Sequence, residues 1–114
     1  MQTNNMDKRT IGKLGEDFAA EYLKNLGYGI IERNYRARTG EIDIICRRSG
    51  FIHFVEVKTR TSDEFGRPCE AVDKRKRANI KAASRSYIQA ARPEAAGYSF
   101  DVMEVTINHL KDVI

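Results

Sequence analysis

The stretch from Glu41 to Lys58, EIDIICRRSGFIHFVEVK, contains the pattern that decides the fold. Its first part, Glu41–Arg48, alternates apolar and polar residues, and its second part opens a run from Phe51 to Arg60 that is rich in aromatic and β-branched residues. Both patterns are typical of β-strands. The Ser49-Gly50 pair between them favours a tight turn. We therefore predict an antiparallel hairpin, whose first strand carries on one face Ile42, Ile44 and Cys46.

A helix is predicted before this hairpin, from about Thr10 to Leu26. Apolar residues recur there at spacings of three and four, which describes one stripe along a helix. We expect this stripe to pack in the core; it consists of Ile11, Leu14, Phe18, Tyr22 and Leu26. Thr10 is a candidate N-cap, and Gly27 is well placed to end the helix.

The remaining elements complete the order α-β-β-β-α-β. Tyr28–Ala37 is predicted as an edge strand that forms a meander with the hairpin, Thr61–Cys69 as a loop, and Phe100–Ile107 as a last strand. A second helix is predicted from about Glu70 to Ala91, ended by Arg92-Pro93. Its expected packing residues are Val72, Ile80, Ala83, Tyr87 and Ile88. These elements predict an α/β fold with helices lying on a central sheet.

Composition narrows the class of protein. The 114 residues suit one domain, which we place at residues 10–114 after a flexible tail of residues 1–9. No apolar run approaches the ~20 residues that cross a bilayer, and residues 1–9 are polar and contain no apolar signal core, so we do not expect secretion. Cys46 and Cys69 have no zinc or disulfide spacing around them, so we expect reduced thiols in a cytoplasmic protein. The net charge of +4 favours polyanionic partners slightly.

Three charged residues of the hairpin are candidates for chemistry. Glu56 and Lys58 share one face of a strand whose apolar neighbours predict burial. Hairpin pairing brings Asp43 near Glu56, because the two lie about equally far from the turn. Two carboxylates on strands ~4.8 Å apart can share a cation, and such oxygen ligands suit Mg²⁺. The competing interpretation of Asp43, Glu56 and Lys58 is an ion pair between two strands and one further charge at the surface.

Glu16 is a candidate third carboxylate, on the first helix. It follows Gly12 and Gly15, and two glycines within one helical turn indicate close approach of a backbone or a ligand. Simple tight packing explains them equally well.

The motifs together resemble those of the PD-(D/E)xK nucleases, the superfamily of restriction endonucleases and archaeal Holliday-junction resolvases. Over residues 10–107 the chain looks like the YraN family of endonuclease-like bacterial proteins. The resemblance is carried by Gly12-x-x-Gly15-Glu16, Asn34-x-Arg36, Gly40-Glu41-Ile42-Asp43, Val55-Glu56-Val57-Lys58, Phe65-Gly66 and Ala71-Val72-x-x-Lys74. Ile42 stands where the superfamily name has proline, a backbone feature and not a ligand.

This resemblance implies a restriction-endonuclease-like αβββαβ core with a mixed central sheet. It also implies that Asp43 and Glu56 hold Mg²⁺, with Mn²⁺ as a substitute, and that Glu16 adds a carboxylate. Lys58 would orient or help deprotonate the attacking water. The physics agrees, since a divalent ion lowers the pKa of bound water and a nearby ammonium stabilises charge on the phosphate.

Basic residues around such a site are candidates for binding nucleic acid. The candidates for contacts with phosphates are Arg36, Arg38, Arg60, Lys74, Arg75, Arg77 and Lys81. A solvated helix face explains the run from Lys74 equally well. Glu41 either joins Asp43 or is solvated near the turn, and His53 and His109 are weak catalytic candidates. Tyr22, Tyr87 and the phenylalanines are expected in the core and not to stack on bases.

Three functions are compatible with these residues. The first is a Mg²⁺-dependent endonuclease acting on branched or otherwise structured DNA. The second is a nucleic-acid-binding module with the same fold and little or no catalysis, and the third is an interaction protein with a structural charge cluster. A homodimer is compatible with the first, because a DNA junction offers two symmetric cuts.

Overall fold

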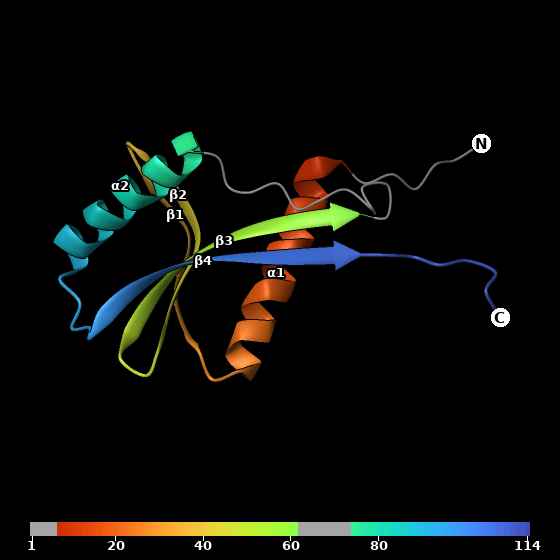
Figure 1. Cartoon of the computed structure of the whole chain (residues 1–114), viewed down its shortest axis with the longest axis horizontal. Coiled ribbons are helices and arrows are strands. Elements are labelled where there is room, and N and C mark those ends of the chain that lie inside the picture. The colour runs from red at the N-terminus through yellow and green to blue at the C-terminus, as the bar shows by residue number, and fades with distance from the viewer. Residues whose placement is uncertain (1–6, 62–73) are drawn as a thin grey trace.

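The computed structural model describes residues 7–61 and 74–114, and within them the predicted order α-β-β-β-α-β is confirmed (Figure 1). The elements are α1 (Lys8–Asn25), β1 (Gly29–Ala37), β2 (Gly40–Arg48), β3 (Phe51–Thr61), α2 (Lys74–Ala91) and β4 (Gly97–Ile107). Lys8 and Arg9 therefore belong to α1 and not to a tail. The predicted loop after Thr61 and the predicted helix start at Glu70 with Val72 lie outside the described residues.

The described strands form one mixed sheet in the order β1-β2-β3-β4. β1–β2 and β2–β3 pair antiparallel, which confirms the meander, and β4 pairs parallel to β3. β1 is an edge strand and β3 is internal, as the sequence predicts. Two parallel strands must be joined by a crossover connection, and α2 forms part of the connection between β3 and β4.

Each helix covers one face of the sheet. Ile80, Ala83 and Tyr87 of α2 pack with Ile42, Ile45, Ile52 and Phe54. The other cluster joins Ala19, Ala20 and Leu23 of α1 to Ile44, Cys46, Val55 and Val105. The packing residues predicted for the described part of α2 are thus confirmed. None of the described helices has the length and apolar character to cross a membrane.

The predicted alternation of β2 is wrong at Asp43. Ile42 packs on the α2 side, whereas Ile44 and Cys46 pack on the α1 side. Asn34 of β1 stands opposite Asp43 between the pairs Arg33↔Ile44 and Tyr35↔Ile42, and its φ is +53°. The two-residue period of β2 therefore fails between Ile42 and Ile44, at the position that faces this left-handed residue of β1.

The predicted packing face of α1 is also wrong. The buried residues are Gly15, Ala19, Ala20 and Leu23, while Leu14, Phe18, Tyr22 and Leu26 are 44 to 59% exposed. Small side chains let the helix approach the sheet closely, so the larger apolar residues lie beside the contact. Asp7, and not Thr10, is the N-cap: its carboxylate accepts a hydrogen bond from the Thr10 N–H at 2.8 Å. Gly27 ends the helix as predicted, with φ of +93°.

Truncating the two kinds of apolar residue on α1 should give different losses of stability. Leu23→Ala is expected to cost about 2–4 kcal/mol, because Leu23 is 6% exposed and truncation leaves a cavity. Phe18→Ala should cost less than about 1 kcal/mol, since the ring is mostly in solvent. Urea unfolding of both variants measures the difference, and equal losses would show that the exposed stripe packs in solution.

Candidate functional site

The sheet divides at the hairpin. Pairing between β2 and β3 ends at Ile44↔Val55, although β2 begins at Gly40 and β3 continues to Thr61. Past this point β2 pairs with β1 and β3 pairs with β4. Figure 1 shows β1 and β2 curving away from β3 and β4. Asp43 and Glu56 are the next residues along the two strands, so both stand where the strands separate.

Asp43 closes the gap between the strands with its side chain. Its Oδ2 accepts a hydrogen bond from the Val57 N–H at 2.7 Å. That donor no longer has a β2 carbonyl opposite, and a buried N–H needs an acceptor. The side chains of Asp43 and Glu56 also interact directly. The proximity predicted from the hairpin register is therefore present.

Burial and neighbouring carboxylates raise the pKa of Asp43 and of Glu16. The pKa of Asp43 rises from its ordinary 3.8 to about 7, first because of burial and then through the charges of Glu56 and Glu16; the Val57 hydrogen bond opposes the rise. The pKa of Glu16 is also raised, again first by burial and further by Glu56, while Arg33 and the Asn34 side chain lower it. Glu16, Asp43 and Glu56 thus form one electrostatically coupled cluster, the carboxylate cluster.

A glycine contact brings Glu16 into this cluster. A Cβ added at Gly15 would lie 1.8 Å from the Thr59 Oγ1 and 2.9 Å from the Thr59 Cβ. An added Cβ at Gly12 would meet nothing within 4 Å. Of the two interpretations of these glycines, close packing therefore holds at Gly15. Because the α1 backbone lies against β3 there, the next residue, Glu16, reaches the carboxylate cluster.

Lys76 supplies a positive charge from α2. Glu56 is only 6% exposed, and its Oε2 forms an ion pair with the Lys76 ammonium. A buried carboxylate needs such a partner, since an uncompensated charge costs several kcal/mol. Lys76 is absent from the predicted site. The signal was the basic run Lys74–Arg77, but adjacent cations point in different directions around a helix, so sequence does not single one out.

The cluster has the donor chemistry of a hard divalent cation. Its members are carboxylates, which suit Mg²⁺, and the charges of Glu56 and Glu16 add to burial in raising the pKa of Asp43. Within residues 7–61 and 74–114, however, no three acidic, imidazole or thiol groups converge closely enough to hold an ion. Glu56 is paired with Lys76, so it would have to release that ammonium to share an ion with Asp43.

Lys58 and Arg60 follow Glu56 along β3. Lys58 is half-buried and shares the α2-side face with Glu56, as the two-residue period predicts. Arg60 Nη1 lies 3.1 Å from the Glu104 carboxylate of β4. Lys58 is therefore the nearer of the two cations along the strand to the carboxylate cluster.

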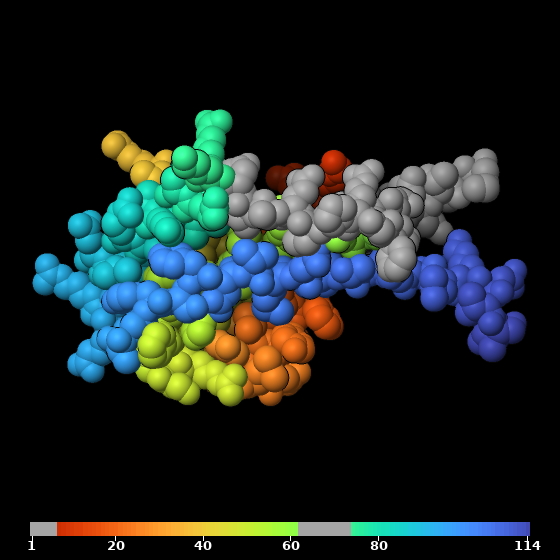
Figure 2. Space-filling view, in the orientation of Figure 1, coloured from red at the N-terminus to blue at the C-terminus, as the bar shows by residue number. Residues whose placement is uncertain are grey.

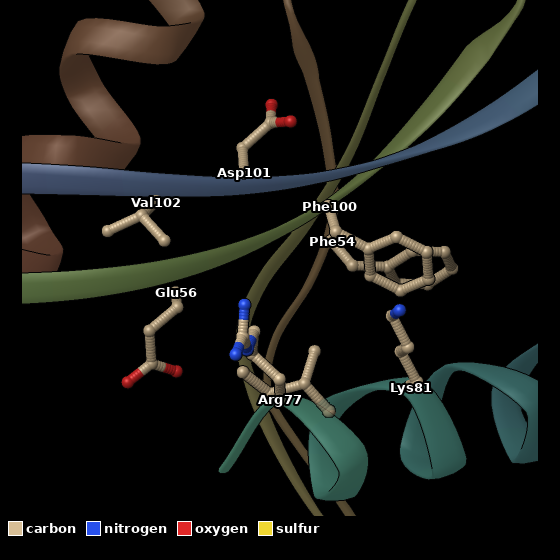
Figure 3. A pocket seen from close by; sticks show the side chains of 8 residues that line it. Phe54, Glu56, Arg77, Lys81, Phe100, Asp101 and Val102 are labelled. Atoms are coloured by element: carbon tan, nitrogen blue, oxygen red, sulfur yellow. The ribbon is translucent and has the colours of Figure 1, made fainter. Parts of the chain in front are cut away.

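The other basic candidates lie on α2 and on the β1–β2 hairpin. Lys74, Arg75, Arg77 and Lys81 are exposed, and Arg77 and Lys81 line a hollow that also contains Glu56 (Figure 3). Arg38 is exposed in the turn before Gly40, where an added Cβ would lie 2.9 Å from the Asn79 carbonyl of α2. Arg36 is exposed and pairs with Glu41 at 3.3 Å. The hairpin tip therefore packs against α2, and its arginines extend the basic surface of that helix.

Glu41 and the histidines stand apart from the cluster. The Glu41 side chain is 62% exposed, which supports the solvated interpretation of this residue. His53 Nδ1 lies 2.8 Å from the Asp101 carboxylate, whose other oxygen accepts a hydrogen bond from Ser99. His109 is exposed near the C-terminus.

The fold and site define an α/β protein with a mixed sheet and a cluster of carboxyl groups where that sheet divides. The chain belongs to the uncharacterised protein family UPF0102, which it matches over residues 15–105. A UPF0102 protein of Caldicellulosiruptor saccharolyticus is 42% identical over 96% of this chain and 92% of its own. One from Clostridium acetobutylicum is 46% identical over 89% of this chain and 83% of its own. The YraN-type resemblance of the motifs is thus confirmed at the level of this family.

Proposed function

We propose that this protein is a divalent-metal-dependent endonuclease that hydrolyses phosphodiester bonds in structured or branched DNA. The observation that carries the proposal is the carboxylate cluster itself. Glu16 from α1, Asp43 from β2 and Glu56 from β3 interact where β2 and β3 stop pairing within the described sheet. Clustered, partly buried carboxyl groups destabilise a fold unless a cation compensates their charge. Such clusters therefore occur preferentially at functional sites.

The residues have separate roles in this proposal. Asp43 and Glu56 would hold Mg²⁺ or Mn²⁺, with Glu16 as a further carboxylate. The bound ion would lower the pKa of a water molecule and stabilise charge on the phosphoryl group. Lys58 orients the attacking water and adds positive charge beside the phosphate. The exposed cations of α2 hold backbone phosphates without reading sequence.

Hydrolysis of a labelled DNA panel tests the proposal. Wild-type protein with Mg²⁺ or Mn²⁺ should cleave at least one junction, flap or bulged substrate, and Lys58→Ala should cleave it roughly 100- to 1,000-fold more slowly, the usual cost of removing one transition-state contact. Glu41→Gln is the matched control, because Glu41 is a solvated carboxylate on the same strand as Asp43. Cleavage that Lys58→Ala leaves unchanged would contradict the role of Lys58, and no cleavage of any substrate would contradict the activity.

The Lys76–Glu56 ion pair favours a second candidate, a nucleic-acid-binding module without catalysis. In that protein the ammonium replaces the metal permanently, and the basic surface alone binds phosphates. Affinity for DNA would then fall steeply with salt while no substrate is cleaved. Lys76→Met separates the candidates: calorimetry should show tighter Mg²⁺ or Mn²⁺ binding if Lys76 competes with the ion, and no ion binding in either protein if the site is purely structural.

A further inference from the structure

A hollow opens beside the carboxylate cluster, between α2 and β4, the last strand of the described sheet. It is lined on the sheet side by Phe54, Glu56, Phe100 and Val102, and on the helix side by Arg77, Ile80 and Lys81. Figure 3 shows the Glu56 carboxylate and the Arg77 and Lys81 side chains on this side of the strands, whereas Asp101 points away from it. Figure 2 shows β4, in blue, running across the visible face below α2. β4 is the last strand of the described sheet on this side, and its Phe100 and Val102 are about half exposed.

The sheet side of the hollow is aromatic. Phe54 is buried and stacks with Phe100, with ring centroids 5.6 Å apart and an interplanar angle of 27°. It stacks similarly with Tyr98. Phe100 is 49% exposed, so the expectation that the phenylalanines are core residues is wrong at this position. Because its inner face rests on Phe54, Phe100 is held in place with part of its surface available to a second flat group.

Two cations flank this aromatic surface. Arg77 and Lys81 are four residues apart on α2 and therefore lie on one side of the helix. The Lys81 Nζ stands 5.9 Å from the Phe100 ring centroid. Among the described residues, neither cation forms an ion pair with a carboxylate. Glu56, the carboxylate that faces the hollow, is paired with Lys76, and Asp101 points away (Figure 3), so Arg77 and Lys81 leave a positive charge that suits a ligand joining a flat aromatic ring to an anion.

We propose that the hollow receives an unpaired nucleotide base of the substrate, stacked on Phe100, with its phosphate held by Arg77 and Lys81 next to Glu56. This inference rests on the proposed function and defines its substrate class: DNA with an unpaired nucleotide at the cleavage site, such as a flap or a bulge. A base in a continuous duplex has both faces covered by its neighbours, and extracting it costs a few kcal/mol, least when it is already unpaired. A peptide joins an aromatic ring to an anion only where an acidic or phosphorylated residue adjoins the ring, whereas every nucleotide carries both a base and a phosphate.

Binding to 2-aminopurine DNA in EDTA tests the inference. One duplex carries a single unpaired 2-aminopurine, and its control carries the same base fully paired. Wild-type protein should bind the unpaired form more tightly and change its fluorescence on stacking. Phe100→Leu keeps an apolar side chain but removes the ring, so it should weaken binding of the unpaired form by roughly 5- to 100-fold. Phe100→Tyr should bind as wild type does, and Phe18→Ala, which removes an exposed phenylalanine of α1, should leave binding unchanged.

Each outcome decides the inference. Normal binding by a folded Phe100→Leu variant, checked by thermal unfolding, would overturn it, as would equal losses for paired and unpaired DNA. If the protein bound neither DNA, the inference would fall together with the nucleic-acid part of the proposed function. Because EDTA removes divalent ions, base stacking without any later cleavage in Mg²⁺ would overturn only the proposed hydrolysis.

Discussion

Replacing Asp43 by asparagine is expected to stabilise the metal-free protein at pH 8 and to abolish its stabilisation by Mg²⁺. The amide oxygen can still accept the Val57 hydrogen bond that the carboxylate accepts at 2.7 Å. The negative charge, which burial, Glu56 and Glu16 all disfavour, is removed. The variant therefore keeps the local structure but no longer holds a buried negative charge beside two other carboxylates, so it should be more stable. It also loses a proposed metal ligand, so stability is gained at the expense of function.

The pH dependence of stability follows from the same carboxyl group. Its pKa is 3.8 ordinarily and about 7 in the folded protein, so between these values the folded state binds more protons than the unfolded state. The resulting stabilisation is complete below pH 3.8 and is lost as the pH rises through 7. The difference between these two pKa values corresponds to a stabilisation of the folded protein of at most roughly 4 kcal/mol. For this group alone, the free energy of unfolding of the metal-free protein should decrease from pH 4 to pH 8, and Asp43→Asn should remove that decrease.

Urea unfolding with and without Mg²⁺ measures both effects. At a Mg²⁺ concentration 100 times the dissociation constant, wild-type protein should gain about 2.7 kcal/mol, and Asp43→Asn should gain nothing. Glu41→Gln is again the control and should behave as wild type in both series. An Asp43→Asn protein that is less stable than wild type at pH 8, or that is still stabilised by Mg²⁺, would contradict the arrangement of charges described here.

Local patterns in the sequence predict the elements and the central pair of the site. The β2–β3 hairpin has a short turn, so residue numbers alone place Asp43 beside Glu56, and the structure has them interacting. The strand period likewise puts Lys58 on the face of Glu56. The first prediction depends only on the short turn that sets the hairpin register, and the second only on residues two positions apart, so neither needs contacts with distant elements.

Features that depend on packing between distant elements could not be predicted. The apolar stripe of α1 suggested Phe18 and Tyr22 as core, but contact with Thr59 selects the face that contains Gly15. Ile42 lies on the α2 side of the sheet although Ile44 lies on the α1 side, a change of side that the two-residue period of a strand does not predict. Lys76 reaches Glu56 only because α2 crosses the sheet at one particular rotation. Periodicity shows that a face exists, whereas tertiary contact decides which face is used.

Gly15→Ala is expected to destabilise the protein by roughly 3 kcal/mol, whereas Gly12→Ala should stabilise it by up to about 1 kcal/mol. Both substitutions favour the helical conformation equally. At Gly15, however, the new methyl group would lie 2.9 Å from the Thr59 Cβ. This atom is bonded directly to the β3 backbone, so no side-chain rotation can move it away. Overpacking of this kind costs about 1–3 kcal/mol or more, and at Gly12 there is nothing within 4 Å to oppose the gain.

The same clash should disturb the carboxylate cluster. Relief of the overlap requires α1 to move away from β3, and Glu16 moves with it, so its charge raises the pKa of Asp43 less. Gly15→Ala should therefore weaken both Mg²⁺ binding and the pH dependence of stability, and Thr59→Ala in the same protein should restore part of each, because it removes the Oγ1 that lies 1.8 Å from the added Cβ. Calorimetry and urea unfolding on the two single variants and the double variant measure this coupling. If Gly15→Ala and Gly12→Ala unfolded at the same urea concentration, α1 would not be held against Thr59, and Glu16 would have no fixed place beside Asp43.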